Sequence, residues 1–189
     1  MRHYFRSPDV FGSSFSFLWN DDLWYLADKQ SVAVRLTSGL GIVTNSKFSP
    51  DGRYIAFRVQ TGEDGSSSDI YSISIPEGVI RRITYLCGKS TSRRMYTDIA
   101  GWTPDNQIVI STDVYSPFGA ITELYKVSPM GGFMSKLPYG PATQIFFIED
   151  EIVLGRHTND MPHWKRYRGG TSGVIWKGSE SEPFKKKLT

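Results

Sequence analysis

The chain has 189 residues, of which 39% are hydrophobic, 14% aromatic and 22% charged, and this composition is typical of a folded globular protein rather than a disordered chain. Its formal net charge of +3 is too small to indicate nucleic-acid binding, which depends on a clustered basic surface, and no apolar run approaches the roughly 20 residues that span a membrane. A single cysteine, Cys87, excludes an intrachain disulfide, and the start MRHYFRSPDV lacks the apolar segment of a secretion signal. We therefore expect a cytoplasmic protein with no nucleic-acid or membrane partner.

The first repeated element is a short apolar strand that carries an aromatic residue in third or fourth place. Its four copies are Asp22 to Leu26, Asp69 to Ile73, Glu123 to Val127 and Gly173 to Trp176. At 13 residues beyond each aromatic residue the chain has Thr37, Thr84, Pro138 and Thr189, each preceded by an aliphatic residue. Turn-forming stretches such as Pro76 to Gly78 lie between the paired runs, so each unit is predicted to end in a hairpin of two strands.

A second repeated element precedes each of these hairpins. Phe48 to Gly52 reads FSPDG and leads into an apolar run, and Trp102 to Asn106 reads WTPDN before a similar run. Proline followed by Asp-Gly or Asp-Asn favours a tight turn. Ser7 to Asp9 is a degenerate copy, which leaves only a stub of a first strand before Pro8, and Ile148 to Asp150 is a weaker copy.

Together the two elements make a unit of four short strands that recurs after 47, 54 and 51 residues, counted between the aromatic positions Trp24, Tyr71, Tyr125 and Trp176. This period predicts an all-β fold, a β-propeller of about four blades of four antiparallel strands. A β-sandwich also has short strands, but it does not predict one internal register four times. We expect a single, incomplete propeller domain over residues 1–189, and its blades span approximately residues 3–37, 42–84, 95–138 and 142–189.

Strand direction places the longer connections, Thr61 to Ser68, Thr112 to Thr122 and Gly155 to Gly173, on one face, where functional residues are expected. The connection from Thr84 to Trp102 runs 18 residues, whereas its counterpart from Thr37 to Phe48 runs 11. Because this connection feeds the innermost strand of the third blade, it should hang over the mouth of the central channel.

That longer connection contains Arg93 and Arg94, with Lys89 beside them. Neighbouring guanidinium groups bind a carboxylate through paired hydrogen bonds, so the arginines are candidates for an anion site that takes the C-terminal carboxylate of a peptide. The alternative is a solvated charged loop. GKST at 88–91 does not form a phosphate-binding loop, because the glycine that such a loop requires is replaced by Ile83 and no helix pattern follows.

A second basic cluster, HWKRYRGG at 163–170, is predicted on the same face and offers Lys165, Arg166 and Arg168 as supporting cations. Its mix of basic and aromatic residues is also found in single-strand nucleic-acid platforms, but the chain supplies no extended basic stripe. His157 and His163 have no obvious third ligand, and no serine lies in a G-x-S-x-G motif. We assign no catalytic residue, no metal site and no cofactor.

Several longer runs carry a family resemblance, namely NDDLW (20–24), FSPDGRYIAFRV (48–59), RRITYLCGKSTSRRMYTDIAGW (81–102), GPATQIFF (140–147) and MPHWKRYRGGTSGVIW (161–176). They resemble, in collinear order over nearly the whole chain, the N-terminal six-bladed propeller of the tricorn peptidase family. The resemblance implies large, cytosolic archaeal serine peptidases that assemble as hexamers and trim oligopeptides released by proteasomes. A second propeller and the catalytic modules would lie outside this chain, so the chain alone should be inactive.

The resemblance also implies a role for the arginine pair. In that family, an arginine pair of the six-bladed propeller holds the substrate's carboxyl terminus, and it corresponds to Arg93 and Arg94. The propeller channel is proposed there as a product route. Two hypotheses remain: a gating and substrate-anchoring part of a tricorn-type peptidase, and a free-standing propeller that binds proteins or peptides without protease activity.

Overall fold

The computed structural model of the protein describes residues 4–61, 67–86, 96–116, 121–157 and 172–188, and within them the regular structure consists of β-strands. Blade 1 contains β1 (Arg6–Phe11), β2 (Ser14–Trp19), β3 (Asp22–Leu26) and β4 (Val34–Arg35). Blade 2 contains β5 (Ile42–Phe48), β6 (Tyr54–Thr61), β7 (Ser67–Ser74) and β8 (Ile80–Arg82). Blade 3 contains β9 (Thr97–Trp102), β10 (Ile108–Thr112), β11 (Glu123–Val127) and β12 (Ser135–Pro141). Blade 4 contains β13 (Gln144–Ile148), β14 (Glu151–Arg156), β15 (Val174–Gly178) and β16 (Lys186–Lys187).

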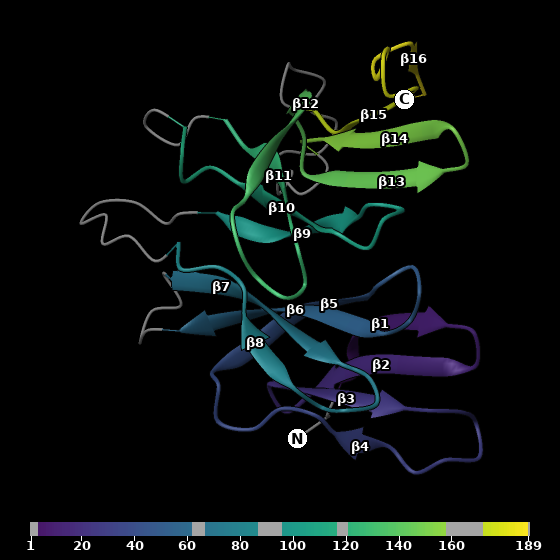
Figure 1. The fold of residues 1–189 in the computed structure, drawn as a ribbon, viewed down its shortest axis with the longest axis vertical. Helices are drawn as coiled ribbons and strands as arrows, with labels where there is room; N and C mark the ends of the chain where they lie inside the picture. The colour runs from purple at the N-terminus through teal and green to yellow at the C-terminus, as the bar shows by residue number, and fades with distance from the viewer. Residues whose placement is uncertain (1–3, 62–66, 87–95, 117–120, 158–171, 189) are drawn as a thin grey trace.

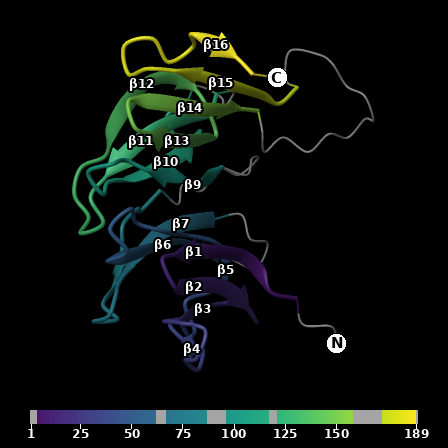
Figure 2. The same ribbon diagram turned by 90° about the vertical axis from the view of Figure 1, so that its right-hand side faces the viewer.

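Each blade is a four-stranded antiparallel sheet in which the strands pair in chain order. The first strands of successive blades contact one another, since β1 touches β5, β5 touches β9, and β9 touches β13. Figure 1 shows the four sheets following one another from blade 1 at the bottom to blade 4 at the top, and Figure 2 shows the same succession from the side. The all-β class and the four-bladed propeller are thus confirmed.

Three separate apolar clusters hold the blades together, one at each junction. The first joins blades 1 and 2 around Leu18, Val43 and Phe57. The second joins blades 2 and 3 around Ile70, Ile99 and Ile108, and the third joins blades 3 and 4 around Leu124, Ile145 and Leu154. The core of this fold therefore lies between the sheets, as expected for stacked repeats that each bury a face against a neighbour.

The middle strands of the inner blades supply side chains to two junctions at once. In β6, Phe57 faces blade 1 whereas Ala56 belongs to the cluster shared with blade 3. In β10, Ile108 faces blade 2 and Val109 faces blade 4. Because successive residues of a strand point to opposite faces, burial on both faces requires a continuous apolar run, which explains the segments IAF and IVI in the sequence.

The first strand of blade 1 differs from its sequence-based expectation. Ser7 to Asp9 was expected to form a turn after a stub of strand, but these residues lie inside the six-residue strand β1, and the turn follows at Gly12 and Ser13. The register shifts between Arg6, paired with Leu18, and Asp9, paired with Ser16. Proline is tolerated at such an irregularity on the edge of a sheet because it has no N–H to donate, so the Ser-Pro-Asp pattern did not indicate a turn here.

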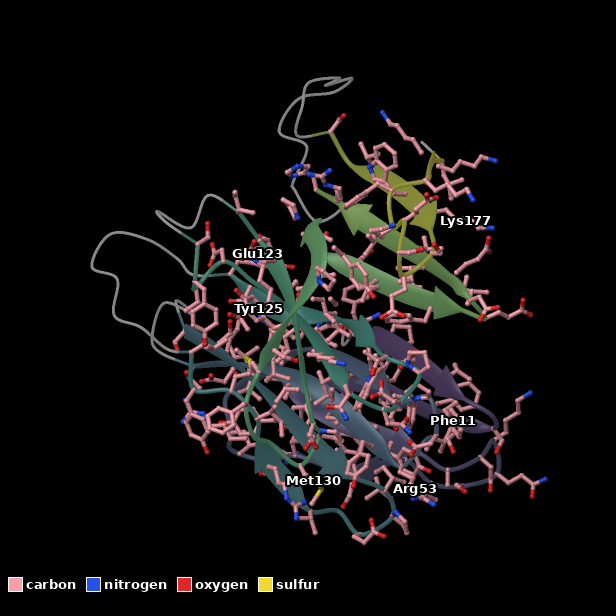
Figure 3. The ribbon with its side chains drawn as sticks, turned by 45° about the horizontal axis from the view of Figure 1, so that its top comes forward. Phe11, Arg53, Glu123, Tyr125, Met130 and Lys177 are labelled. Atoms are coloured by element: carbon pink, nitrogen blue, oxygen red, sulfur yellow. The ribbon has the colours of Figure 1, made fainter. Side chains whose placement is uncertain are left out.

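Glycine permits close contact between neighbouring blades at two points. Gly52, in the β5–β6 turn, has φ = +71° and lies under the ring of Phe11, which Figure 3 labels beside Arg53 of the same turn. Gly101 of β9 lies directly against the backbone carbonyl of Ile145 in β13, and a Cβ there would collide with that oxygen. The innermost strands of blades 3 and 4 can therefore approach backbone to backbone.

Candidate functional site

Strand pairing defines one face of the propeller at which blades 2, 3 and 4 have their longer connections, whereas blade 1 has the short β2–β3 turn there. At this edge Thr61 pairs with Ser67 in blade 2, Thr112 pairs with both Thr97 and Glu123 in blade 3, and Arg156 pairs with Val174 in blade 4. The turns between the first and second strands of the blades lie at the opposite ends of the strands, along the right-hand side of Figure 1. We call the first the loop face and the second the turn face.

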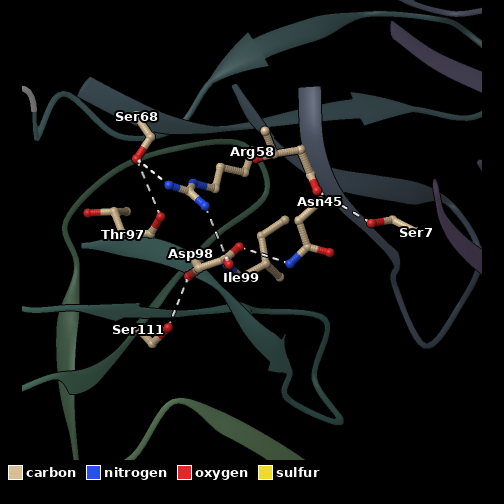
Figure 4. A network of polar contacts seen from close by, with 9 residues as sticks. Ser7, Asn45, Arg58, Ser68, Thr97, Asp98, Ile99 and Ser111 are labelled. Carbon is tan, nitrogen blue, oxygen red and sulfur yellow. Dashed lines mark hydrogen bonds and ion pairs between the residues drawn. The ribbon is translucent and has the colours of Figure 1, made fainter. Parts of the chain in front are cut away.

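At the loop face, a polar network links blades 2 and 3 close to the innermost strands (Figure 4). Arg58 of β6 lies 3.7 Å from the Asp98 carboxylate of β9, and both side chains are 17% exposed. Asn45 Nδ2 donates to Asp98 Oδ1 at 2.8 Å, and Arg58 Nη2 donates to Ser68 Oγ at 3.3 Å. The contacts cross the junction of the two blades, and they place a paired charge where that junction would otherwise be apolar.

The same edge holds both described ends of the connection between blades 2 and 3. The Leu86 N–H donates to Asp69 Oδ1 at 3.0 Å, and the Tyr96 N–H donates to Asp113 Oδ1 at 2.9 Å. Asp113 N–H in turn donates to the Tyr96 carbonyl at 3.2 Å. One carboxylate from each blade therefore fixes where this connection leaves β8 and where it enters β9.

Asp69 is itself the centre of a brace that recurs in blade 1. Thr84 Oγ1 donates to Asp69 Oδ1 at 2.9 Å, Arg82 Nη2 donates to Asp69 Oδ2 at 2.6 Å, and the Ile70 N–H donates to Thr84 Oγ1 at 2.9 Å. In blade 1 the corresponding residues, which make the corresponding bonds, are Asp22, Arg35, Leu23 and Thr37. Both carboxylates are buried, at 5% exposure for Asp22 and 2% for Asp69, so these charge-assisted bonds form away from bulk water.

Sequence reasoning missed these acid and base partners although a signal was present. The threonines were aligned by their distance from the aromatic residue of the third strand. The same alignment places an acid two residues before that aromatic residue and a base eleven residues after it. In blade 2 these are Asp69 and Arg82, and blades 1 and 3 have an acid and a base at the same two positions. Reading only the apolar positions left the polar half of the repeat unnoticed.

Two tyrosines of blade 3 lie together at the outer part of the loop face. Tyr115 is 57% exposed, and its ring centroid lies 5.2 Å from that of Tyr125. Burial, followed by the negative charge of Glu123, raises the pKa of the Tyr125 phenol above its ordinary value. Lys136 Nζ donates to Glu123 Oε1 at 2.6 Å, and this hydrogen bond raises the pKa of the Lys136 ammonium. Figure 3 labels Glu123 and Tyr125 side by side on β11.

On blade 2, the loop face presents an aromatic residue close to the same connection. Tyr85 is 73% exposed, and the guanidinium carbon of Arg82 lies 4.5 Å from its ring centroid. Arg82 also donates to Asp69, so one guanidinium group joins the buried brace to an exposed ring. A peptide side chain approaching this edge would meet an aromatic surface beside a cation.

The candidate anion-binding residues Lys89, Arg93 and Arg94 lie outside the described residues, and so do Lys165, Arg166 and Arg168. The structure thus defines the positions from which the connection of residues 87–95 departs and returns. Among the residues that it describes, no group of three or more histidine, cysteine, aspartate or glutamate side chains could hold a metal ion. No helix in the described ranges is long and apolar enough to cross a membrane.

Comparison with other proteins agrees with this architecture. The family model described as the tricorn protease N-terminal beta propeller domain matches residues 2–189. The tricorn protease of Thermoplasma acidophilum is 46% identical over 180 residues, and the match covers 95% of this chain and 17% of that protein. A crystal structure of the tricorn protease superposes with a TM-score of 0.87 at 44% identity, over 100% of this chain and 18% of that one.

A relative of different size is also similar. A Sulfurisphaera tokodaii protein described as a Tricorn-like protease N-terminal subunit is 35% identical, and the match covers 92% of this chain and 85% of that protein. TolB from Acinetobacter baumannii, at 18% identity and a TM-score of 0.62, shares the fold alone. The chain spans less than a fifth of the length of the Thermoplasma tricorn protease. On its sequence and its structure, the chain belongs to the tricorn protease N-terminal β-propeller family.

Proposed function

We propose that this chain is the non-catalytic propeller portion of a tricorn-type serine peptidase, in which it gates the channel and binds the C-terminal carboxylate of oligopeptide substrates through Arg93 and Arg94. The observation that carries the proposal is the anchoring of the connection that contains them. Asp69 holds Leu86 and Asp113 holds Tyr96, so the connection begins and ends at the loop face beside the innermost strand β9.

The electrostatics of the described edge support an anion as the ligand. Asp69 is paired with Arg82, and Asp98 is paired with Arg58. Both carboxylates thus have a cationic partner within the blades. A peptide carboxylate suits the arginine pair as a ligand, because guanidinium groups bind carboxylates through paired hydrogen bonds.

The larger assembly follows from the same proposal. The catalytic modules and a second propeller lie in the same chain or a neighbouring chain, and the complete peptidase is a cytoplasmic homo-oligomer, a hexamer, that degrades oligopeptides. The Sulfurisphaera relative, which bears the description of an N-terminal subunit and is mostly covered by the match, supports a propeller carried on a chain of its own. That observation favours a partner of catalytic chains over a free-standing binding module.

The test uses the complete peptidase that contains this propeller. Replacing Arg93→Ala together with Arg94→Ala should raise the KM for peptides with free carboxyl ends. The loss of one arginine alone should weaken binding by about ten- to a hundredfold, because a hydrogen bond to a charged group is worth roughly 1.5–3 kcal/mol before solvent screening. The KM for the same peptides with amidated ends should stay nearly unchanged.

Arg53→Ala is the matched control, since Arg53 is an exposed arginine of the turn face. It should leave the KM of both peptide types at the wild-type value. Equal losses for free and amidated peptides in the double variant would show that the pair acts on charge in general or on structure, and the anchoring proposal would then be wrong.

A further inference from the structure

A pocket of about 740 Å³ opens on the turn face between blades 3 and 4, on the side of the molecule opposite to the loop face. Its floor is formed by apolar side chains of three strands, Leu137 of β12, Phe147 of β13 and Ile152 of β14. Leu137 and Ile152 are buried members of the cluster that joins the two blades, and Phe147 packs against it. The pocket is therefore built into a rigid junction.

Carboxylates from three separate turns surround the mouth of this pocket. They are Asp105 from the β9–β10 turn, Glu149, Asp150 and Glu151 from the β13–β14 turn and the start of β14, and Glu180 from the β15–β16 connection. Glu151 is paired with Lys177 at 2.6 Å, and Figure 3 labels this lysine on blade 4. Lys126 is the basic residue among the lining side chains. The lining thus keeps a clear excess of negative charge.

Tyr139 of β12 provides a second, independent feature that points to a ligand. Its side chain lines the pocket although the residue is only 3% exposed. Its hydroxyl makes no hydrogen bond to another residue in the described part of the chain. Burial, and then the negative charge of Glu180, raises the pKa of this phenol, so it stays a neutral donor and acceptor. The hydroxyl oxygen is not sealed from solvent, so it is open to a ligand in the pocket, and Tyr O–H groups normally find a partner when the ring is buried.

We propose that this pocket binds the side chain of an arginine carried by another polypeptide segment. The methylene stem of arginine covers apolar surface while its guanidinium group remains near the polar rim. The planar fork matches carboxylates such as Glu149 and Asp150, and its weak hydration suits a partly buried site better than an ammonium group does. The free lone pair of Tyr139 accepts a further N–H, and the ring of Phe147 offers a face to the cation.

The binding test uses the 189-residue chain carrying Phe5→Ser and Val10→Lys, two changes at exposed apolar positions of blade 1 that counter self-association and lie outside the pocket. The probe is the peptide acetyl-Gly-Arg-Gly-amide, which has no free carboxylate and so is not a ligand for Arg93 and Arg94. Its partner probe replaces arginine by citrulline, which has nearly the same shape and no charge. The arginine peptide should bind at least about tenfold more tightly at low salt, with backbone amide NMR shifts centred on Tyr139 and Glu149 to Ile152. Raising the salt concentration should weaken it.

Variants then assign the contacts. Glu149→Gln with Asp150→Asn should weaken binding of the arginine peptide by about tenfold, and Tyr139→Phe, which preserves the ring, by about threefold. Glu77→Gln is the control, since Glu77 is an exposed acid in the β7–β8 turn, on the same face but in blade 2. Near-UV circular dichroism verifies that each variant keeps the native packing.

Three outcomes would overturn the proposal. The citrulline peptide could bind as tightly as the arginine peptide, the Glu77 control could weaken binding as much as the pocket variants, or the peptide could shift amides elsewhere and leave the pocket unchanged. Each would show that no arginine-specific site exists between blades 3 and 4. Because the probe is amidated, none of these outcomes bears on substrate anchoring at the loop face.

Discussion

The hydroxyl of Thr84 satisfies two groups at the loop end of blade 2. It accepts a hydrogen bond from the Ile70 N–H and donates one to Asp69, while Thr84 itself is 2% exposed. Thr37 does the same in blade 1 for Leu23 and Asp22. A buried donor or acceptor that loses its partner destabilises the folded state by its full desolvation free energy, so this hydroxyl should contribute strongly to stability.

We expect Thr84→Val to lower the free energy of unfolding by about 2–3 kcal/mol, because valine keeps the shape of threonine but leaves the Ile70 N–H and one Asp69 oxygen without this partner. Thr84→Ser, which restores a hydroxyl, should recover most of that loss. Urea denaturation followed by tryptophan fluorescence measures both effects.

Thr61→Val serves as the control at another strand position, because the Thr61 hydroxyl makes no hydrogen bond within the described ranges. Its effect should stay within about 0.5 kcal/mol. A loss of equal size in the Thr61 and Thr84 variants would indicate a general intolerance of valine in these strands and would contradict the brace.

At the scale of the element, blade 3 replaces the buried brace by a more exposed pair. Its acid is Glu123 and its base is Lys136, while Pro138 stands where blades 1 and 2 have threonine. Proline offers no hydroxyl, so the acid is held by Lys136 and by the phenol of Tyr125, whose O–H lies 3.4 Å from Glu123 Oε2. The strands β11 and β12 therefore depend on groups that titrate in alkaline solution.

This dependence predicts a loss of stability at high pH. The folded-state pKa values of Tyr125, Tyr139 and Lys136 are all raised above the ordinary 10.0 for tyrosine and 10.5 for lysine. Above these ordinary values the unfolded chain gives up its protons first, so the contribution is complete below about pH 10 and disappears as the pH rises through the folded-state values.

Chemical denaturation at a series of pH values measures the effect. The free energy of unfolding should fall as the pH rises above the ordinary values of 10.0 and 10.5. Tyr125→Phe combined with Tyr139→Phe should flatten that fall. An identical alkaline slope in this double variant would show that other groups control the transition, and the assignment to blade 3 would be rejected.

In strand β1, the local residue pattern indicates a turn although the structure has a strand. Pro8-Asp9 carries turn-forming residues, yet Asp9 lies in β1 because its carboxylate accepts the Phe48 N–H of the neighbouring blade at 2.6 Å. Ser7 similarly donates to the Thr44 carbonyl at 3.4 Å (Figure 4). The other turn motifs were predicted correctly, because the geometry of a tight turn depends on a few neighbouring residues. Here a contact between blades outweighed the local preference.

At the scale of the whole molecule, the two end blades present apolar surface on the sides that face away from the other blades. On blade 1, Phe5 is 69% exposed and packs edge-on against Phe17, and Val10 of β1, paired with Phe15, is 55% exposed. On blade 4, Ile148 is 56% exposed and Leu188 is 46% exposed. The inner blades bury the corresponding faces in the clusters between them.

We therefore expect the 189-residue chain, purified by itself, to self-associate at micromolar concentration, because repeat units bury their faces against a neighbour and exposed apolar faces attract one another. Phe5→Ser with Val10→Lys should reduce the association, and light scattering provides the measurement. Val79→Lys, at an exposed position in the β7–β8 turn, is the control and should change little. A compact, stable monomer of the unaltered chain would instead favour a closed four-bladed ring and a free-standing function.

The sequence by itself determined the class of fold, the four strands of each blade, most of the turns and the face that carries the long connections. These features depend on alternation along a strand and on turn residues, which act over a few neighbouring positions. It also identified the arginine pair, a prediction that concerns residues outside the described ranges and stays a prediction.

Only the tertiary structure decided which polar residues meet. Asn45 and Asp98 are 53 positions apart, and the pocket around Tyr139 draws carboxylates from turns between Asp105 and Glu180. No local pattern encodes such meetings, because they follow from the angle at which one blade packs on the next, and that angle is determined by side chains from both blades together. The order of the strands can therefore be predicted from the residues, whereas the Asn45–Asp98 contact and the pocket around Tyr139 form only when two blades pack together.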